Sequence, residues 1–351
     1  MSPLRTQSQT TPQAAPQAPH ATDGAAAAEI ELALLDAVEG DDPDGFVAIM
    51  AGEHLATGGK RMRARLVMET CAAFSVAEHT AVGFAAAVEM LHNATLVHDD
   101  IQDGDTVRRG QPTVWARHGV AQAINVGDLM LMLPISRHIA SLPVDEAIRW
   151  RLAEALTRHA EAVVRGQADD LSLRDRLMSD PSLDAVEELL FCAERKTAAL
   201  FSLCAEGAAL LAGKSPDEAR RLAEPFAAVG VAFQLVDDII DAYGDKGRAA
   251  PGNDVREGKI SILVAEHLAL FPAERGWLLD ILALPREQTR DAQVAQVLAR
   301  MAHGGALDNA LSHVTTLAFE VRRTAEAPLA DVLLRCLDLC LAPLSTLRRP
   351  S

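Results

Sequence analysis

Six aspartates stand in two similar clusters far apart in the chain. The first cluster lies in the segment Leu96-Val-His-Asp-Asp-Ile-Gln-Asp103, and the second lies in Phe233-Gln-Leu-Val-Asp-Asp-Ile-Ile-Asp241. On a helix, the first and last aspartates of each DDxxD pattern share one face, and the middle one projects about 100° around the axis. The sequence therefore predicts two fans of carboxylates: Asp99, Asp100 and Asp103, and Asp237, Asp238 and Asp241.

Local energetics oppose these fans, because aspartate costs roughly 0.5 kcal/mol relative to alanine in a helix and like charges four residues apart repel. A hard divalent cation would offset that cost. Mg²⁺ fits better than Ca²⁺, since it bridges one or two carboxylates to substrate phosphates and the chain has no EF-hand loop. A single DDxxD would be read as a solvated helix end, but two copies favour a metal site.

Clusters of cations complement the aspartates in an otherwise acidic chain. One cluster spans Gly58–Arg63 and another is Arg108-Arg109-Gly110, and single cations follow at Lys196, Lys246, Arg248 and Lys259. Diphosphates cannot approach six aspartates without metal, and they gain most from bidentate arginine. Metal on one side and cations on the other would form a diphosphate clamp, although each cation alone would be read as an ordinary surface charge.

Composition excludes several classes of protein. The 351 residues include 33 Lys+Arg and 49 Asp+Glu, so a general nucleic-acid or anionic-membrane binder is not expected. The five cysteines form no CxxC pair, which argues against a disulfide framework or a thiolate zinc site and favours reduced thiols in a cytoplasmic protein. We expect no transmembrane segment, because the apolar run Ala198–Gly213 is interrupted by Glu206.

Alanine and leucine dominate from Ala25 onward and predict an all-α fold. Residues 1–24, rich in Pro, Gln and Thr, are expected to be a disordered tail, and 25–351 one helical domain, because no internal linker is present. Loops are expected at 104–112 and 243–254. The expected helices are 26–39, 44–57, 60–75, 78–103, 119–141, 144–172, 183–213, 217–243, 258–270, 286–302 and 328–345.

With these motifs in this order, the chain resembles a trans-isoprenyl diphosphate synthase of the polyprenyl synthetase family, most like a geranylgeranyl diphosphate synthase. The resemblance runs from GGKRMR at 58 through EMLHNATLVHDDIQDGDTVRRGQPTVW, GQADDL, KTAAL and FQLVDDIID to GNDVREGK at 252–259. It implies a single large antiparallel helical bundle around a central cavity, usually a homodimer. It also implies Mg²⁺ as cofactor, with three ions in the substrate-bound site.

The resemblance also implies roles for particular residues. The six aspartates would bind the metal ions that hold an allylic diphosphate, and Arg108, Lys196 and Lys259 would contact the same diphosphate. Thr197 and Gln234 would lie beside the reacting carbons, where dipoles stabilise positive charge. The isopentenyl diphosphate site would consist of Lys60, Arg63, His92 and Arg109. His98 is read either as a support for the neighbouring aspartates or as a buried histidine.

Three positions depart from the family pattern. Ala249-Ala250-Pro251 stands where the family usually has Gly-Lys-Pro, so one diphosphate-binding lysine is absent and Arg248 or Lys246 is its expected substitute. Trp115 stands in place of a histidine, and Ala64 in place of a proline. The terminal Arg348-Arg349 is read as an exposed charged tail rather than a diphosphate contact.

The expected reaction is head-to-tail condensation of isopentenyl diphosphate with dimethylallyl, geranyl or farnesyl diphosphate. In the family, residues five and four positions before the first aspartate limit the product, and here they are the small Ala94 and Thr95. Leu91 and Val88 would be the next obstacles. Met130 and Met132 are candidates for the floor, or for core packing. Geranylgeranyl diphosphate is the expected product, with farnesyl and longer products open.

Three other functions remain open from the sequence. A class I terpene cyclase shares the helical bundle and first motif, but it carries an Asn/Ser/Glu metal triad in place of a second DDxxD. A non-catalytic subunit that modulates a partner synthase normally lacks one of the motifs. An acidic helical interaction module would explain neither the arginine pair nor the repeated motif.

Overall fold

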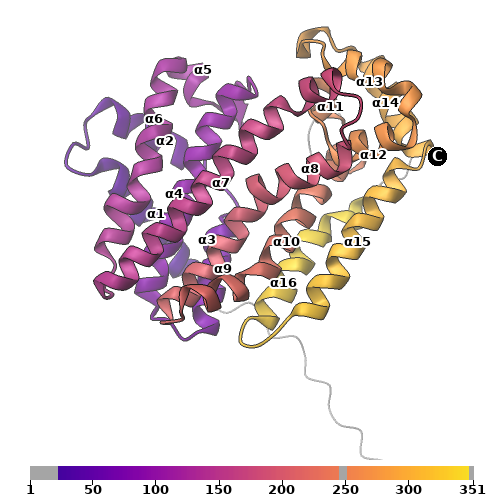
Figure 1. Cartoon of the computed structure of the whole chain (residues 1–351). Coiled ribbons are helices and arrows are strands. Elements are labelled where there is room, and N and C mark those ends of the chain that lie inside the picture. The colour runs from indigo at the N-terminus through magenta and orange to yellow at the C-terminus, as the bar shows by residue number, and fades with distance from the viewer. Residues whose placement is uncertain (1–22, 245–250, 348–351) are drawn as a thin grey trace, which may run out of the picture.

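The computed structural model describes residues 23–244 and 251–347, and helices make up most of these segments (Figure 1). Of the expected N-terminal tail, only the last two residues are described, and they already belong to the first helix. Lys246, Arg248, Ala249, Ala250 and the pair Arg348-Arg349 lie outside the described residues. Predictions for those positions stay predictions.

The first half of the chain carries the first aspartate motif on a long helix. Its elements are α1 Asp23–Glu39, α2 Phe46–Ala56, α3 Met62–Ala73, α4 Glu78–Gln102, β1 Val107–Arg108, β2 Gln111–Pro112, α5 Val114–His118, α6 Val120–Leu133, the π-helical turn η1 Pro134–Ile139, α7 Glu146–Ser179, α8 Ala185–Ala193, the π-helical turn η2 Glu194–Ala198 and α9 Ala199–Leu211. The first motif is at the C-terminal end of α4.

The second half carries the second motif at the end of another long helix. Its elements are α10 Pro216–Tyr243, α11 Asn253–Glu257, α12 Ile262–Leu270, the short 3₁₀ helix η3 Pro272–Glu274, α13 Arg275–Leu282, the 3₁₀ helix η4 Arg286–Gln288, α14 Asp291–His303, α15 Ala306–Thr324, α16 Ala330–Leu341 and the 3₁₀ helix η5 Ala342–Thr346. The all-α fold class is therefore confirmed, with one two-residue hairpin in the described chain.

Helix α10 lies between two regions of the core (Figure 1). On one side it packs on α9, which in turn contacts α3 and α7, and on the other side it packs on α15. One core cluster centres on α4 and α9 and includes Phe84, Met130 and Phe201, whereas the other joins α10 to α12, α13 and α14. The two aspartate motifs belong to helices of this packed interior, so their positions are fixed by burial of the apolar residues around them.

Most expected helices exist within a few residues, but α7 continues to Ser179 rather than ending at 172, and the sequence reading missed four helices. Helix α15, of 19 residues, was absent from the expected list, and so were α5, α11 and α13. The error at α15 has a physical cause. Its stripe of Leu307, Ala310 and Val314 is buried, so packing stabilises a segment whose Asn, His and Thr residues are poor helix formers.

By length and apolar composition, α4 resembles a membrane-crossing helix, and it is the one such helix within the described segments. However, 78% of its most apolar 18-residue window is buried in the protein interior, as in a core helix. Its composition is therefore explained by packing against α3, α6 and α1.

Candidate active site

The two aspartate motifs open into one cavity of about 270 Å³. Asp99 and Asp103 come from α4, and Asp237 and Asp238 come from α10. The same cavity is lined by Lys196, Lys259, Gln234, Asp170 and Asp254. Two segments that are distant in sequence therefore place carboxylates and ammonium groups around a common space.

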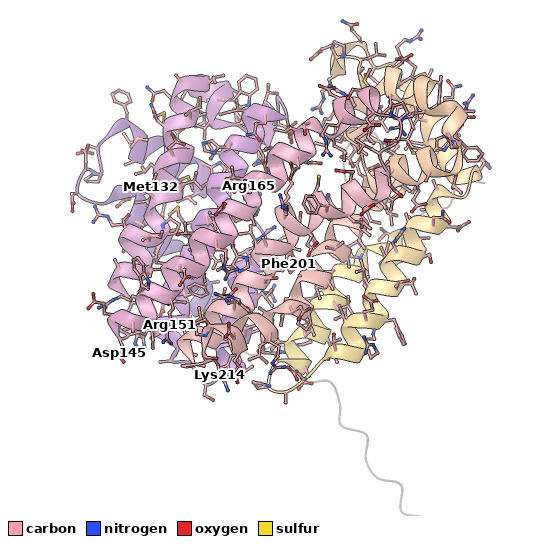
Figure 2. All side chains as sticks on the ribbon, in the orientation of Figure 1. Met132, Asp145, Arg151, Arg165, Phe201 and Lys214 are labelled. Carbon is pink, nitrogen blue, oxygen red and sulfur yellow. The ribbon has the colours of Figure 1, made fainter. Side chains whose placement is uncertain are left out.

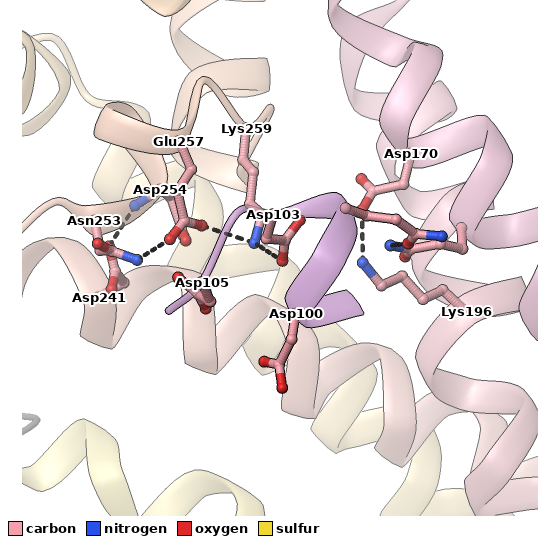
Figure 3. Close-up of polar contacts among 12 residues, drawn as sticks. Asp100, Asp103, Asp105, Asp170, Lys196, Asp241, Asn253, Asp254, Glu257 and Lys259 are labelled. Atoms are coloured by element: carbon pink, nitrogen blue, oxygen red, sulfur yellow. Dashed lines mark hydrogen bonds and ion pairs between the residues drawn. The ribbon is translucent and has the colours of Figure 1, made fainter. Parts of the chain in front are cut away.

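The remaining two aspartates of the motifs point elsewhere. Asp100 does not line the cavity, and its Oδ1 accepts a 2.7 Å hydrogen bond from Nε of Arg108. Asp241 also lies outside it, where Oδ2 accepts from the backbone N–H of Asp254 at 3.0 Å and so holds the start of α11. Figure 3 shows Asp100 pointing away from the group formed by Asp103 and Lys259. The structure therefore brings together four of the six predicted metal-binding aspartates.

Asp238 is held by protein donors on both of its oxygens. Oδ1 accepts from the side-chain amide of Gln234 at 2.8 Å, and Oδ2 accepts from the backbone N–H of Ile262 at 3.0 Å. Gln234 in turn accepts a 2.8 Å hydrogen bond from the hydroxyl of Thr197. Burial raises the pKa of Asp238 to about 7, although these hydrogen bonds oppose the rise. The chain Thr197–Gln234–Asp238 fixes the orientation of the predicted cation-stabilising dipoles.

Each of the two cavity lysines is paired with a carboxylate. Nζ of Lys196 lies 2.8 Å from Asp170, and Nζ of Lys259 lies 2.9 Å from Asp103 (Figure 3). Burial alone would lower the pKa of each lysine, but the nearby carboxylates outweigh burial and raise it. Both lysines are therefore charged and face the space where a diphosphate would lie. Asp170, from GQADDL, was not among the predicted site residues, although its place in that motif was the available signal.

A π-helical turn presents Lys196 and Thr197. The turn, Glu194–Ala198, interrupts the path from α8 to α9, and such bulges are frequent at functional sites. Gly166 of α7 packs directly against it, since a Cβ at that position would lie 2.6 Å from the backbone N of Lys196. Glycine at 166 therefore allows α7 to approach closely, which brings Asp170 of the same helix within reach of Lys196.

A two-residue hairpin positions the arginine pair. Val107 pairs with Pro112 and Arg108 with Gln111, and the intervening Arg109 and Gly110 have φ of 53° and 78°. Positive φ at both central residues is typical of a type I′ turn. Arg108 is thereby directed to Asp100. The Arg109 guanidinium packs against Gly59, so closely that a Cβ added at Gly59 would lie 2.7 Å from Nη1 of Arg109.

The other predicted isopentenyl diphosphate residues gather near this hairpin. Arg63 donates from Nη1 to Nε2 of His92 at 3.0 Å. Burial, and then the charge of Arg63, holds the pKa of His92 well below its ordinary value, so the imidazole is neutral and accepts. Lys60 is exposed. Within residues 23–244 and 251–347, Nε of Arg63 is buried without a hydrogen-bond partner.

Met132 and His98 do not take the supporting positions that the sequence predicted for them at the cavity floor and beside the aspartates. Met132 is 65% exposed on the outside of α6, so its prediction as cavity floor is wrong (Figure 2). Met130 is fully buried, as either reading requires. His98 is oriented towards α6, with Nε2 3.5 Å from Asp128 and its ring against Gly127, rather than towards the aspartates.

The four positions predicted to limit product length lie on α4, outside the cavity lining. Among the residues described, the cavity lining extends along α4 only as far as Leu96 and includes none of the four predicted positions. Val88, Leu91 and Ala94 are buried in the core, and Thr95 is half-buried with its hydroxyl on the carbonyl of His92 at 2.7 Å. Their effect on product length stays a prediction.

The residues present fit Mg²⁺. The cavity donors are carboxylate oxygens, the ligands that Mg²⁺ prefers, and they include the half-buried Asp99. Burial raises the pKa of Asp99, which a bound cation would reverse. No three His, Cys, Asp or Glu side chains of the described segments already form a metal cage.

Comparisons with known proteins show which family the chain belongs to. A family model described as polyprenyl synthetase matches residues 47–301. The geranylgeranyl diphosphate synthase of Sulfolobus acidocaldarius is 36% identical over 240 residues, which cover 66% of this chain and 69% of that protein. A short chain isoprenyl diphosphate synthase of Methanothermobacter thermautotrophicus is 31% identical over 298 residues, covering 82% of this chain and 89% of the other.

A solved structure has the same fold. The polyprenyl synthase of Caulobacter crescentus CB15, whose crystal structure is a complex with calcium and isoprenyl diphosphate, superposes with a TM-score of 0.76. The two chains are 25% identical, and the match covers 93% of this chain and 96% of that one.

Proposed function

Because the chain belongs to the polyprenyl synthetase family and is a trans-prenyl diphosphate synthase, we propose that it condenses isopentenyl diphosphate with an allylic diphosphate in the cavity between α4 and α10. We propose Mg²⁺ as the metal and geranylgeranyl diphosphate as the product. The observation that carries this proposal is that Asp99, Asp103, Asp237 and Asp238 line one space together with Lys196 and Lys259.

The chain's own groups supply most of the first step. Lys196 and Lys259 would exchange Asp170 and Asp103 for the oxygens of the allylic diphosphate and so neutralise the leaving group. Asp99, Asp103 and Asp237 would hold Mg²⁺, which when bound stabilises the negative charge that develops on the departing diphosphate. The bond between the allylic carbon and its oxygen then breaks, which leaves pyrophosphate in the cavity.

The positive charge left on the substrate needs polar groups that cannot react with it. The Thr197 hydroxyl donates a 2.8 Å hydrogen bond to the side-chain carbonyl of Gln234, which lines the cavity, and the bond to Asp238 keeps Gln234 in place. Such preorganised dipoles stabilise a cation without reorganising during the reaction. The double bond of isopentenyl diphosphate attacks the cation, and the departed pyrophosphate is the proposed base that removes the proton.

The second substrate would bind on the hairpin side. Arg63, Arg109 and the neutral His92 are close enough to act on one another electrostatically, and Lys60 adds an exposed cation. A diphosphate there would satisfy the buried Nε of Arg63. Two anions would then be held by separate cation groups, which orients them for reaction.

The proposal that the product is geranylgeranyl diphosphate is supported by the small residues before the first motif and by the geranylgeranyl diphosphate synthase among the relatives. Thr95 lies on the same face of α4 as Asp99, one turn earlier, so the growing chain would pass it. Leu91, one turn further, and Val88, two turns further, are the next side chains near that face.

We also propose a homodimer. It is supported by large apolar side chains that α6 and α7 expose, with Met132 65% and Trp150 73% exposed, which a subunit interface would bury. A mass near 37.5 kDa by light scattering, rather than twice that value, would contradict the dimer.

Product analysis tests the proposed reaction. We expect the purified protein, incubated with isopentenyl diphosphate, farnesyl diphosphate and Mg²⁺, to release pyrophosphate and form a C20 diphosphate that mass spectrometry identifies. Pyrophosphate release from the allylic substrate alone, with a hydrocarbon product, would indicate a terpene cyclase. Absence of turnover with every allylic partner would indicate a modulatory subunit and refute the proposal.

A further inference from the structure

Arg286 joins the two loops that follow the aspartate motifs. It lies in η4, far along the chain from both motifs, and no motif of the sequence includes it. Its Nη1 lies 3.1 Å from Asp105, directly after the first motif, and 3.2 Å from Glu257, after the second. Its Nη2 donates to Asn253 at 2.8 Å. One guanidinium therefore bridges the segment after the first motif and helix α11, which follows the second motif.

Glu257 links the Arg286 guanidinium to Lys259, which lines the cavity. The other oxygen of Glu257 lies 2.8 Å from Nζ of Lys259, which also contacts Asp103 at 2.9 Å. Figure 3 shows Lys259 between Glu257 and Asp103. The contacts form a continuous series of alternating charges in the order Asp103, Lys259, Glu257, Arg286 and Asp105.

Burial explains why Glu257 needs more than one donor. Its side chain is only 5% exposed, and an ionised carboxylate at such a site requires hydrogen bonds and opposite charge. Asn253 and Arg286 both donate to Oε1, which leaves Oε2 to Lys259. Without Arg286, the uncompensated charge of Glu257 would be shared by Lys259 and Asn253 alone, and Lys259 would be held more tightly.

We propose that Arg286 is a positioning residue that acts through Glu257 on Lys259. By neutralising Glu257, it leaves the Lys259 ammonium free to transfer from Asp103 to an incoming diphosphate while Glu257 keeps it at the cavity edge. By contacting Asp105, it also holds the loop after the first motif against α11. This inference rests on the proposed function, because that function assigns Lys259 to the allylic diphosphate.

The fold itself depends little on Arg286. Its side chain is 41% exposed, and ion pairs of that kind contribute modestly to stability. We therefore expect Arg286→Gln to fold with a nearly unchanged melting temperature. Arg290→Gln is a matched control, because Arg290 lies four residues further along the chain and, among the described residues, its guanidinium hydrogen-bonds to Gln293 rather than to either motif segment.

Titration calorimetry of inorganic pyrophosphate in the presence of Mg²⁺ tests the proposal without turnover. We expect Arg286→Gln to weaken binding about tenfold, as for other residues that orient ligand-binding groups, and Arg290→Gln to stay within twofold of the wild type. Arg286→Lys should recover part of the loss, because one ammonium can reach Glu257 but cannot bridge both loops. A wild-type affinity in Arg286→Gln would overturn the proposal.

A double mutant separates action through Lys259 from independent action. In a Lys259→Gln background, the Arg286→Gln change should add no more than a twofold loss, since the group on which it acts is gone. An undiminished tenfold loss in that background would show that Arg286 acts by another route and would refute the inference.

Hydrogen exchange of the protein without metal or substrate tests the bridge by itself. Arg286→Gln should accelerate amide exchange in both 104–112 and 251–259, and Arg290→Gln in neither. Unchanged exchange would contradict the bridge even if the enzyme is active. A wild type that does not bind pyrophosphate would instead refute the proposed function and the role of Lys259, and the exchange result would still decide whether Arg286 joins the loops.

Discussion

Replacing Gly59 by alanine should displace Arg109 and weaken isopentenyl diphosphate binding. A Cβ at Gly59 would lie 2.7 Å from Nη1 and 2.8 Å from both Cζ and Nη2 of Arg109. Ordinary contact between such atoms is about 3.5–4.0 Å, so the guanidinium must move by about 1 Å. A displacement of that size in a binding group can cost up to about a hundredfold in rate.

Backbone strain must be separated from this displacement. Gly59 has φ of 151° and Gly58 has φ of 72°, so alanine at either position costs about 1–2 kcal/mol of stability. However, a Cβ at Gly58 would meet nothing within 4 Å. Gly58→Ala is therefore a control that introduces strain without contacting Arg109.

Steady-state kinetics with varied isopentenyl diphosphate provide the assay. We expect Gly59→Ala to raise KM for isopentenyl diphosphate about tenfold or more, with little change in KM for the allylic substrate, and Gly58→Ala to leave both within about twofold. In an Arg109→Gln background, Gly59→Ala should have no further effect on that KM. Equal effects of the two glycine variants, or an undiminished effect without Arg109, would refute the reasoning.

Three other outcomes are expected. Asp99→Asn or Asp237→Asn should reduce turnover by about three orders of magnitude while circular dichroism shows unchanged helix content, because each loses a carboxylate that lines the cavity; retained turnover would exclude the metal role. Thr95→Phe should shorten the product to farnesyl diphosphate, as identified by mass spectrometry. Ala94→Phe should do the same and, because Ala94 is fully buried, should also cost about 1–3 kcal/mol of stability. Unchanged products of both variants would show that these positions do not limit product length. The metal-free protein should lose stability as pH rises from about 4 to 7, because burial raises the pKa of Asp238 from 3.8 to about 7 and folding therefore favours its protonated form. Addition of Mg²⁺ should then raise the melting temperature more at pH 8 than at pH 5.5. An equal rise at both pH values would contradict this account.

The paired aspartate motifs were predictable because type and spacing carry the information locally. A DDxxD at a helix end fixes which carboxylates share a face, and the first motif follows this rule, with Asp99 and Asp103 on the cavity and Asp100 off it. The second motif does not follow it, because Asp237 and Asp238 line the cavity whereas Asp241 accepts from the backbone N–H of Asp254 outside it. The same rule would have corrected the reading of Met132, which lies two residues from the buried Met130 and so on the opposite side of α6.

Contacts between distant segments could not be predicted in this way. Arg286 meets Asp105 across 181 residues, and Lys196 meets Asp170 only because a π-helical turn and Gly166 bring two helices together. Neither the turn nor the approach has a local sequence signature. Asp241 and Asp238 each also accept from a backbone N–H group of a later segment, and these contacts depend in the same way on tertiary packing.

A crystal structure with Mg²⁺ and a non-reactive allylic diphosphate analogue tests the central claim most directly. The account predicts metal ions between the two motifs, ligated by Asp99 or Asp103 from α4 and by Asp237 from α10, with Lys196 and Lys259 on the diphosphate. Ions ligated by one motif alone, or a diphosphate bound outside the cavity, would contradict it.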